Sequence, residues 1–319
     1  MSDREPRGSR PWLGAALSTT AGATGLAGLA VRLSVRDALP ATGMMFYATP
    51  WPVLASLLVL MAGGLRLRNR SPWTSPVAAT GLIVMVGWAV NSHSNPPLAG
   101  LSDDTLSCLT WNTDHGQAGW DRLAQTIHGE PTDMVCLVEA GPTEPELDRF
   151  WQDRFPNHVS SGLGSGMLVL VRNGTVRQTR SGSLADTVRF RQFDVCCRGH
   201  DLVLILADVT STPWVSRQQA LAQLHELATT ITDKPVLITG DFNTPTDSAW
   251  FDRWRLSLTN AWEAAGNGFR PTWPLPLPLL DLDQCWGNRR VGFVDCHTAW
   301  SSHSDHQQLI TRFAINPRK

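Results

Sequence analysis

The 319-residue sequence lacks several signatures that would place it in a common class of protein. Its six cysteines include no C-x-x-C pair, and Cys108 and Cys136 stand inside apolar runs, which favours buried thiols. No Gly-rich nucleotide loop, internal repeat or low-complexity tract is present. No Ser or Cys stands in a nucleophile-elbow motif, which argues against acyl transfer.

Net positive charge is also missing from the larger part of the chain. Residues 100–319 contain 19 basic and 25 acidic residues, a net charge of −6. A domain that grips nucleic acid through its phosphates is usually basic. The charge therefore argues against DNA as the main substrate, although a nuclease remains an alternative.

The first ninety residues contain three apolar segments with almost no charge. They are residues 12–31, 44–65 and 73–90, and each approaches the roughly 20 residues that a helix needs to cross a bilayer. Tryptophans lie near the segment ends, where aromatic belts form. The sequence therefore predicts a membrane anchor of about three transmembrane helices in residues 1–90.

Arginines are confined to the junctions between these segments. Three of them lie between the second and third segments at 66, 68 and 70, and three precede the first at 4, 7 and 10. The positive-inside rule puts both clusters in the cytoplasm, so everything after residue 90 lies outside. The result is the same if the first segment is a cleaved signal peptide. We therefore expect a multi-pass protein of the cytoplasmic membrane with an extracytoplasmic catalytic domain.

Beyond a polar linker at residues 91–104, the pattern changes to alternating strands and helices. Six apolar runs predict strands, at 106–111, 133–138, 166–171, 202–207, 235–239 and 307–313. Residues 117–129 and 214–232 have helical patterns. This arrangement indicates a layered α/β or α+β domain over residues 105–319.

Polar residues stand at the ends of several of these strands, where a rigid scaffold can hold a side chain for catalysis. They are Asn112, Glu139, Asp241, Asn243, Asp283, Asp305 and His306. Carboxylate and amide oxygens suit Mg²⁺ or Mn²⁺, and a carboxylate away from the metal can accept a proton from water. An imidazolium can neutralise the charge that develops on a phosphorane. The set therefore indicates attack of water on a phosphate ester.

The order of these motifs resembles the endonuclease/exonuclease/phosphatase superfamily, which is DNase I-like, over residues 105–315. The resemblance implies an α+β fold, a four-layer α/β/β/α sandwich. It implies three metal-site residues, namely Asn112, Glu139 and Asp305. It also implies four catalytic residues, in which Asp241 activates water with Asn243 as its orienting partner, and His306 stabilises the phosphate with Asp283 orienting it.

One position departs from the family pattern. The superfamily commonly has a histidine at the end of the middle strand, and this chain has Asp208 there. An aspartate beside a phosphate dianion repels it unless it is protonated or bound to metal. Asp208 is therefore a candidate substrate or metal contact, and a degenerate, non-catalytic binding module remains an alternative.

The apolar N-terminal segments, the arginine-rich second loop and the Thr272-Trp273-Pro274 stretch resemble a membrane-anchored bacterial branch of the superfamily, typified by a teicoplanin-resistance phosphatase. That branch implies a lipid-linked substrate such as undecaprenyl pyrophosphate. A short linker would keep the site near the bilayer, where lipid headgroups are concentrated. We therefore expect a phosphorylated substrate and membrane lipid as partners, with nucleic acid less favoured.

Overall fold

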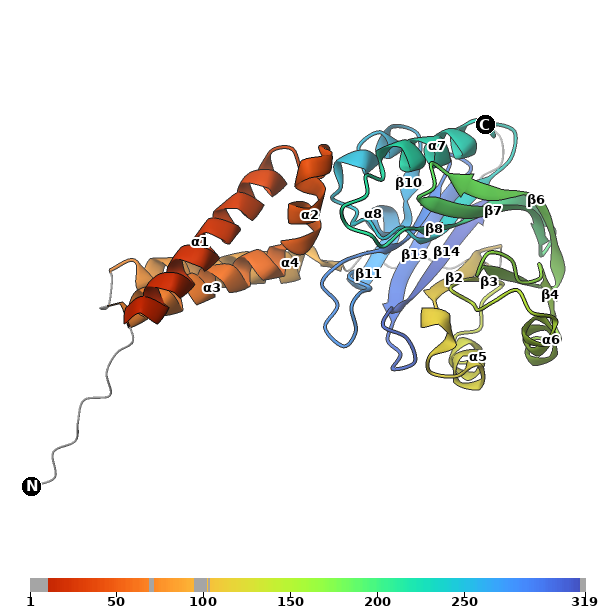
Figure 1. Cartoon of the computed structure of the whole chain (residues 1–319). Helices are drawn as coiled ribbons and strands as arrows, with labels where there is room; N and C mark the ends of the chain where they lie inside the picture. The colour runs from red at the N-terminus through yellow and green to blue at the C-terminus, as the bar shows by residue number, and fades with distance from the viewer. Residues whose placement is uncertain (1–10, 69–71, 95–101, 103, 316–319) are drawn as a thin grey trace, which may run out of the picture. The chain divides into compact units, whose positions relative to one another are not determined.

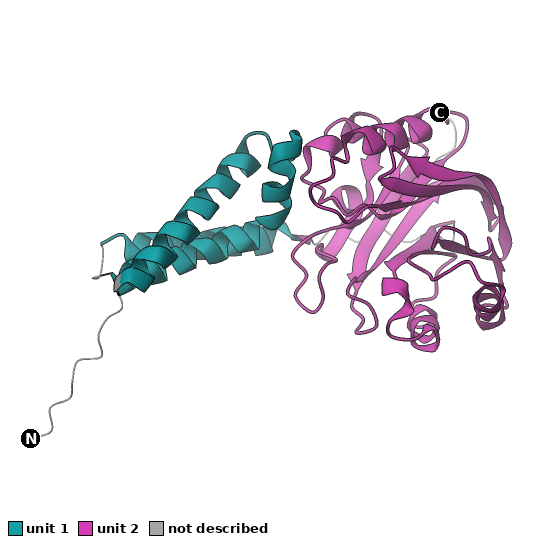
Figure 2. Cartoon of the chain, in the orientation of Figure 1, with its two compact units in different colours: residues 1–92 teal, residues 93–319 magenta. Residues whose placement is uncertain are grey.

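The computed structural model describes residues 11–68, 72–94, 102 and 104–315. It has two compact units, residues 1–92 and residues 93–319, which Figure 2 shows in different colours. The described part of the second unit begins within the predicted linker, because residues 93–94 form a short strand. Residues 95–101 and 103 of that linker lie outside the described residues.

The described part of the first unit is helical. Its helices are α1 (Pro11–Leu33), α2 (Pro40–Ala48), α3 (Trp51–Leu67) and α4 (Thr74–Asn91). Within α1 and α4, residues 12–33 and 74–91 are long and apolar enough to cross a membrane, and the bent pair α2–α3 adds a third candidate if it is one span. Two or three candidate spans therefore stand where three were expected.

The second apolar segment, expected as one helix over residues 44–65, is broken. Helices α2 and α3 are bent by 70° at the break between them. Pro50 follows Thr49 at this break, and a residue that precedes proline is driven out of the helical conformation. Thr49 accordingly has φ −121° and ψ 57°.

Helices α1 and α3 approach each other closely at two glycines. A Cβ atom added to Gly14 would lie 2.8 Å from the carbonyl oxygen of Gly64. Small residues of this kind let helix backbones pack together where no hydrophobic effect drives association, as in a bilayer.

The second unit contains two mixed β-sheets (Figure 1). The larger has the strand order β1 (His93–Ser94), β11 (Gly266–Phe269), β13 (Val291–Ala299), β14 (Gln308–Ile315), β2 (Leu106–Asn112), β3 (Met134–Val138), β5 (Leu168–Arg172) and β4 (His158–Ser160). The smaller has the order β10 (Thr259–Asn260), β12 (Asp283–Gly287), β9 (Val236–Asp241), β8 (His200–Val209), β7 (Val188–Cys197) and β6 (Gly174–Leu184).

Helices cover the outer faces of the two sheets. Helices α5 (Trp120–His128) and α6 (Pro145–Arg154) pack on the larger sheet, and α7 (Gln218–Thr229) packs on the smaller one. The shorter elements are α8 (Ala261–Ala265), η1 (Asp114–Gly116), η2 (Ala249–Phe251) and η3 (Trp254–Leu256). Apolar side chains from both sheets, such as Cys136 and Leu204, form the core between them. The expected α+β fold, with two sheets between helices, is confirmed.

All six predicted strands and both predicted helices are present, with ends shifted by a few residues. The β6–β7 hairpin was not predicted. Strand β6 is mostly exposed and polar, so it carries no apolar run that would mark it. Its absence from the prediction matters for the site, because β7 contributes two arginines to it.

Candidate active site

Four charged residues form a row across the smaller sheet. Asp283 on β12 pairs with Asp241 on β9, Asp241 pairs with Asp208 on β8, and Asp208 pairs with Arg189 on β7. Residues at paired positions on neighbouring strands point to the same face of a sheet. Side chains alternate between the two faces of each strand, and the row lies on the face that is turned toward the larger sheet.

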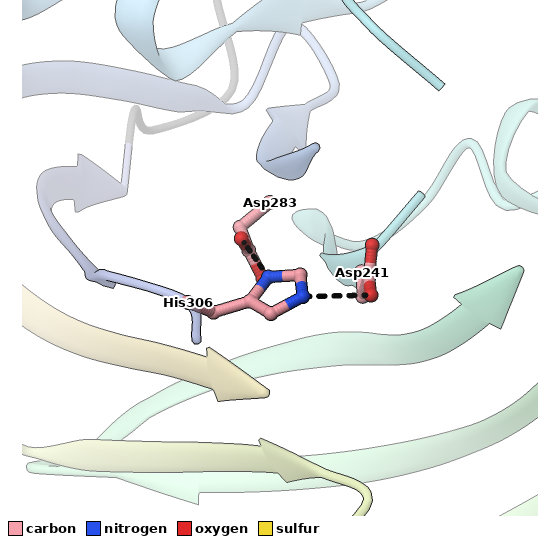
Figure 3. Close-up of side chains that lie close together, drawn as sticks. All are labelled: Asp241, Asp283 and His306. Carbon is pink, nitrogen blue, oxygen red and sulfur yellow. Dashed lines mark hydrogen bonds and ion pairs between the residues drawn. The ribbon is translucent and has the colours of Figure 1, made fainter. Parts of the chain in front are cut away.

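His306 lies between two members of this row (Figure 3). Its Nδ1 atom is 2.8 Å from Asp283 Oδ2, and its Nε2 atom is 3.8 Å from Asp241 Oδ2. His306 belongs to the loop before β14, so the contact joins the larger sheet to the smaller one. All three side chains are buried.

Two asparagines hold the Asp241 carboxylate. Asn112, at the end of β2, donates from Nδ2 to Asp241 Oδ2 at 2.9 Å. Asn243 donates from its backbone N–H to Oδ1 at 2.8 Å and from Nδ2 to Oδ2 at 3.0 Å. Asn243 has φ +45°, a conformation that asparagine tolerates better than most residues. The Asp-x-Asn spacing therefore lets Asn243 hydrogen-bond both oxygens of the Asp241 carboxylate.

Gly240 lets strands β8 and β9 meet closely beside Asp241. Its φ is +140°, and a Cβ atom there would lie 1.9 Å from the carbonyl oxygen of Ala207. Such a contact is impossible for any other residue, so a glycine is required directly before the aspartate.

The loop that carries His306 is fixed by hydrogen bonds to β2. Ser304 Oγ accepts from the backbone N–H of His306 at 3.0 Å and donates to the carbonyl oxygen of Asn112 at 2.7 Å. The indole N–H of Trp111 donates to the carbonyl oxygen of His306 at 3.0 Å. The imidazole is therefore held in place through its own backbone.

The two buried charges shift each other's pKa. Burial lowers the pKa of His306, but the carboxylates of Asp283 and Asp241 outweigh it and raise the pKa to about 10. Burial raises the pKa of Asp241 to about 7, although His306 opposes this. The histidine is therefore an imidazolium at neutral pH, and the aspartate is poised to exchange a proton.

Asp241, Asp283 and His306 also lie close enough together to suggest a metal cluster, since one ligand atom of each falls within 4.8 Å of the others. Both ring nitrogens of His306, however, face carboxylates, and the raised pKa of His306 leaves the ring protonated at neutral pH. A metal ligand must be a neutral imidazole with a free lone pair. An imidazolium bridging two aspartates explains this geometry better than a metal ion does.

The predicted metal residues lie around this centre. Glu139 follows β3 with φ +52°, and its Oε2 is 3.4 Å from His115 Nε2. Asp305 accepts from the indole N–H of Trp273 at 2.9 Å, and its Oδ1 lies 3.9 Å from His306 Nε2. Both carboxylates are partly exposed, so they present hard oxygen ligands toward solvent.

Asp208, the candidate substrate or metal contact, does not stand alone in the row. It forms an ion pair with Nη2 of Arg189. Burial raises the pKa of Asp208 and Glu139 adds to the rise, while Arg189 opposes it. Sequence patterns pointed to Asp208 but missed Arg189, because β7 was not predicted as a strand.

Arg191, two residues further along β7, was also missed. Its buried guanidinium donates from Nη1 to the carbonyl oxygens of Gly162 and Met167, each at 2.7 Å. In the same loop, the carbonyl of Gly166 accepts from the backbone N–H of Ala140 at 2.8 Å. Arg191 therefore supports the loop that packs beside Glu139.

A family model for the endonuclease/exonuclease/phosphatase family matches residues 109–306, a span that includes every site residue predicted from the sequence. The chain belongs to this family. Members of the family are hydrolases that act on phosphate esters, among them nucleases, phosphodiesterases and phosphatases, and they typically depend on a divalent metal. None of the curated proteins has a sequence that matches this member.

Solved structures share the fold of this family member at low sequence identity. A humanized TDP2 from D. rerio is 16% identical and has a TM-score of 0.52, with 67% of this chain and 100% of that chain covered. A mannosyl-6-phosphatase from Bacteroides thetaiotaomicron is 12% identical, with a TM-score of 0.51 and coverage of 66% and 100%. The human Nocturnin catalytic domain, with bound sulfate, is 14% identical, with a TM-score of 0.51 and coverage of 68% and 96%.

Proposed function

We propose that the protein is a membrane-anchored, metal-dependent phosphohydrolase that hydrolyses a phosphate ester or pyrophosphate, with a lipid-linked pyrophosphate as its favoured substrate. The observation that carries this proposal is the placement of His306 between Asp283 and Asp241. It puts a fixed cation beside a carboxylate that can accept a proton, which is what attack of water on phosphorus requires.

Asp241 takes the role of general base. Its raised pKa brings proton transfer close to neutral pH, where a base is most effective. The hydrogen bonds from Asn112 and Asn243 fix the carboxylate, so that one orientation is presented to water. His306 then donates a hydrogen bond to a phosphoryl oxygen, and Asp283 holds the ring in the orientation that this needs.

A divalent cation fits the residues on the open side of this centre. Glu139 and Asp305 offer partly exposed carboxylates, and the buried Asn112 adds an amide oxygen that also accepts from the backbone N–H of Asp114 at 3.0 Å, which together form the hard donor set that Mg²⁺ or Mn²⁺ prefers. Asp208 and Glu139 are close enough for one carboxylate to raise the pKa of the other, a repulsion that a cation would relieve. When bound, the cation would stabilise negative charge on the phosphate and its leaving oxygen.

The membrane anchor supports a lipid-linked substrate. Two or three candidate spans precede the catalytic unit, and the arginines at 66 and 68 lie at the end of α3, on the side expected to be cytoplasmic. The catalytic unit would then work outside the cytoplasmic membrane, close to lipid headgroups. The resemblance to the teicoplanin-resistance branch supports the same substrate class.

Reconstitution of the full chain in vesicles tests this function. Release of phosphate from a polyprenyl pyrophosphate would be measured with Mg²⁺ or Mn²⁺, beside cleavage of plasmid DNA. Asp241→Ala should abolish activity, and Asp153→Asn, which changes an exposed aspartate on α6, should not. Plasmid cleavage alone would identify a nuclease, and a protein with neither activity nor metal-induced stabilisation would be a binding module.

A labelling experiment tests the topology. A cysteine introduced at exposed position 153, in a Cys196→Ser background, would be treated in intact cells with a membrane-impermeant maleimide. The other native cysteines are buried and should stay unlabelled. Labelling only after the cells are permeabilised would refute the extracytoplasmic assignment.

A further inference from the structure

The ion pair between Arg189 and Asp208 is asymmetric in its exposure. The Asp208 side chain is 6% exposed, whereas the Arg189 side chain is 51% exposed. Among the described residues, Asp208 is the one charged partner of Arg189, and the contact uses Nη2. The carboxylate is therefore fixed inside the row, while much of the guanidinium still faces solvent with N–H groups to donate.

The position of this guanidinium follows from the strand register. Asp208 is paired directly with Asp241, and neighbouring strands lie about 4.8 Å apart. Arg189 is one strand further along, and its side chain reaches back to Asp208. A phosphate bound against Asp241 and His306 would therefore lie within reach of the guanidinium.

The row also has a charge problem that Arg189 can solve. Asp283, Asp241 and Asp208 are three consecutive acids, and a phosphate dianion approaching them is repelled. The positive charge of His306 offsets the negative charge of Asp283 and Asp241. On the far side of Asp208, Arg189 is the member of the row that carries positive charge.

We propose that Arg189 binds the phosphate of the substrate and that Asp208 positions it. This inference rests on the proposed function and assigns the side of the site next to β7. The guanidinium is planar and offers five N–H donors, so it can keep one contact with Asp208 and present another edge to phosphate oxygens. Asp208 then acts through Arg189, as the residue that holds the cation in place.

Binding of inorganic phosphate to the full chain in detergent tests this assignment without turnover. The titration would be done with EDTA to remove divalent metal ions, so that phosphate binding depends on the positively charged side chains alone. Arg189→Gln should weaken phosphate binding about tenfold or more, because a charge-assisted contact is lost. Arg189→Lys should retain part of the affinity, since it keeps the charge without the planar fork.

The same hairpin supplies a matched control. Arg177 on β6 pairs with Asp194 on β7 at 2.6 Å, and its side chain is 74% exposed. Arg177→Gln should leave phosphate affinity unchanged. A double variant, Arg189→Gln with Asp208→Asn, should bind phosphate better than Arg189→Gln alone, because it removes the carboxylate that is left unpaired.

The outcomes separate this inference from the function on which it rests. Arg189→Gln protein that binds phosphate as the wild type does, or wild-type protein that binds none, would overturn the role of Arg189, whatever its catalytic activity. An inactive wild type that loses phosphate binding on Arg189→Gln would keep the phosphate site and refute the hydrolase.

Discussion

The Asp283 carboxylate contacts His306 Nδ1 through Oδ2 at 2.8 Å, while its Oδ1 atom is buried with no hydrogen-bond partner among the described residues. An incompletely satisfied buried carboxylate is costly to keep. The Oδ2 contact both fixes the orientation of the imidazole and raises its pKa.

The raised pKa of His306 predicts a pH-dependent stability. The imidazole titrates near 6.5 in the unfolded chain and at about 10 in the folded one. Between these values the folded state holds a proton that the unfolded state has released, so stability falls as pH rises from about 6.5 to about 10. Urea denaturation of metal-free protein across this range should show the fall.

Asp283→Asn tests the cause of that dependence. The variant removes the strongest charge that raises the His306 pKa, so the slope of stability against pH should flatten above pH 7. The alkaline limb of the activity profile should move to lower pH for the same reason. An unchanged slope, with Asp153→Asn as the control, would show that the pair does not set the pKa.

The two hydrogen bonds that Asn243 makes to Asp241 predict that a change of this side chain lowers the catalytic rate more than it lowers stability. Asn243→Gly keeps the backbone conformation at φ +45° and the backbone N–H bond to Asp241 Oδ1, but loses the Nδ2 bonds to Asp241 Oδ2 and to the carbonyl oxygen of Val209. We expect a drop in kcat of about 10- to 100-fold, because the base is less well oriented, and a small fall in Tm, because the carbonyl of Val209 loses its donor. A large loss of Tm with normal kcat would assign the side chain a purely structural role.

Arg191 predicts an indirect effect on the metal site. Arg191→Leu removes the hydrogen bonds of 2.7 Å to the carbonyl oxygens of Gly162 and Met167, together with those to Gln178 and Ser161, and should destabilise the protein by about 2–4 kcal/mol. It should also weaken binding of Mg²⁺ or Mn²⁺, because the loop beside Glu139 loses its support. Isothermal titration would measure the affinity, and wild-type affinity in the folded variant would contradict the coupling.

Metal binding itself should stabilise the folded protein. Mg²⁺ at about 100 times its Kd is expected to add about 2.7 kcal/mol of stability, seen as a rise in Tm. Glu139→Ala should abolish most of this rise. Glu146→Ala, at an exposed position on α6, should not. An equal rise in both variants would place the cation elsewhere.

Much of the site could be predicted because its residues follow buried apolar strands. Asp241 and Glu139 stand directly at the ends of such runs, where periodicity is easy to recognise. Arg189 was not found in this way, because β7 contains no continuous apolar run and lies beside a polar edge strand. The pairing of Arg189 with Asp208 is a contact between strands, which only register reveals.

The N-terminal helices show the same limit. Composition predicted the apolar segments, but not the 70° bend between α2 and α3, which lies at Thr49 and Pro50 inside an apolar run. Hydropathy averages over a window and does not detect a single backbone restriction.

The close approach of Gly240 to Ala207 has a consequence for how variation in this protein should be read. In a saturation mutagenesis library, position 240 should tolerate substitution as poorly as position 241, although glycine has no side chain to offer the reaction. Intolerance at 241 would reflect the loss of the catalytic carboxylate, and intolerance at 240 would reflect a backbone clash that prevents folding. A selection for folded, surface-displayed protein would tell them apart, since it should keep Asp241 variants and discard those of Gly240.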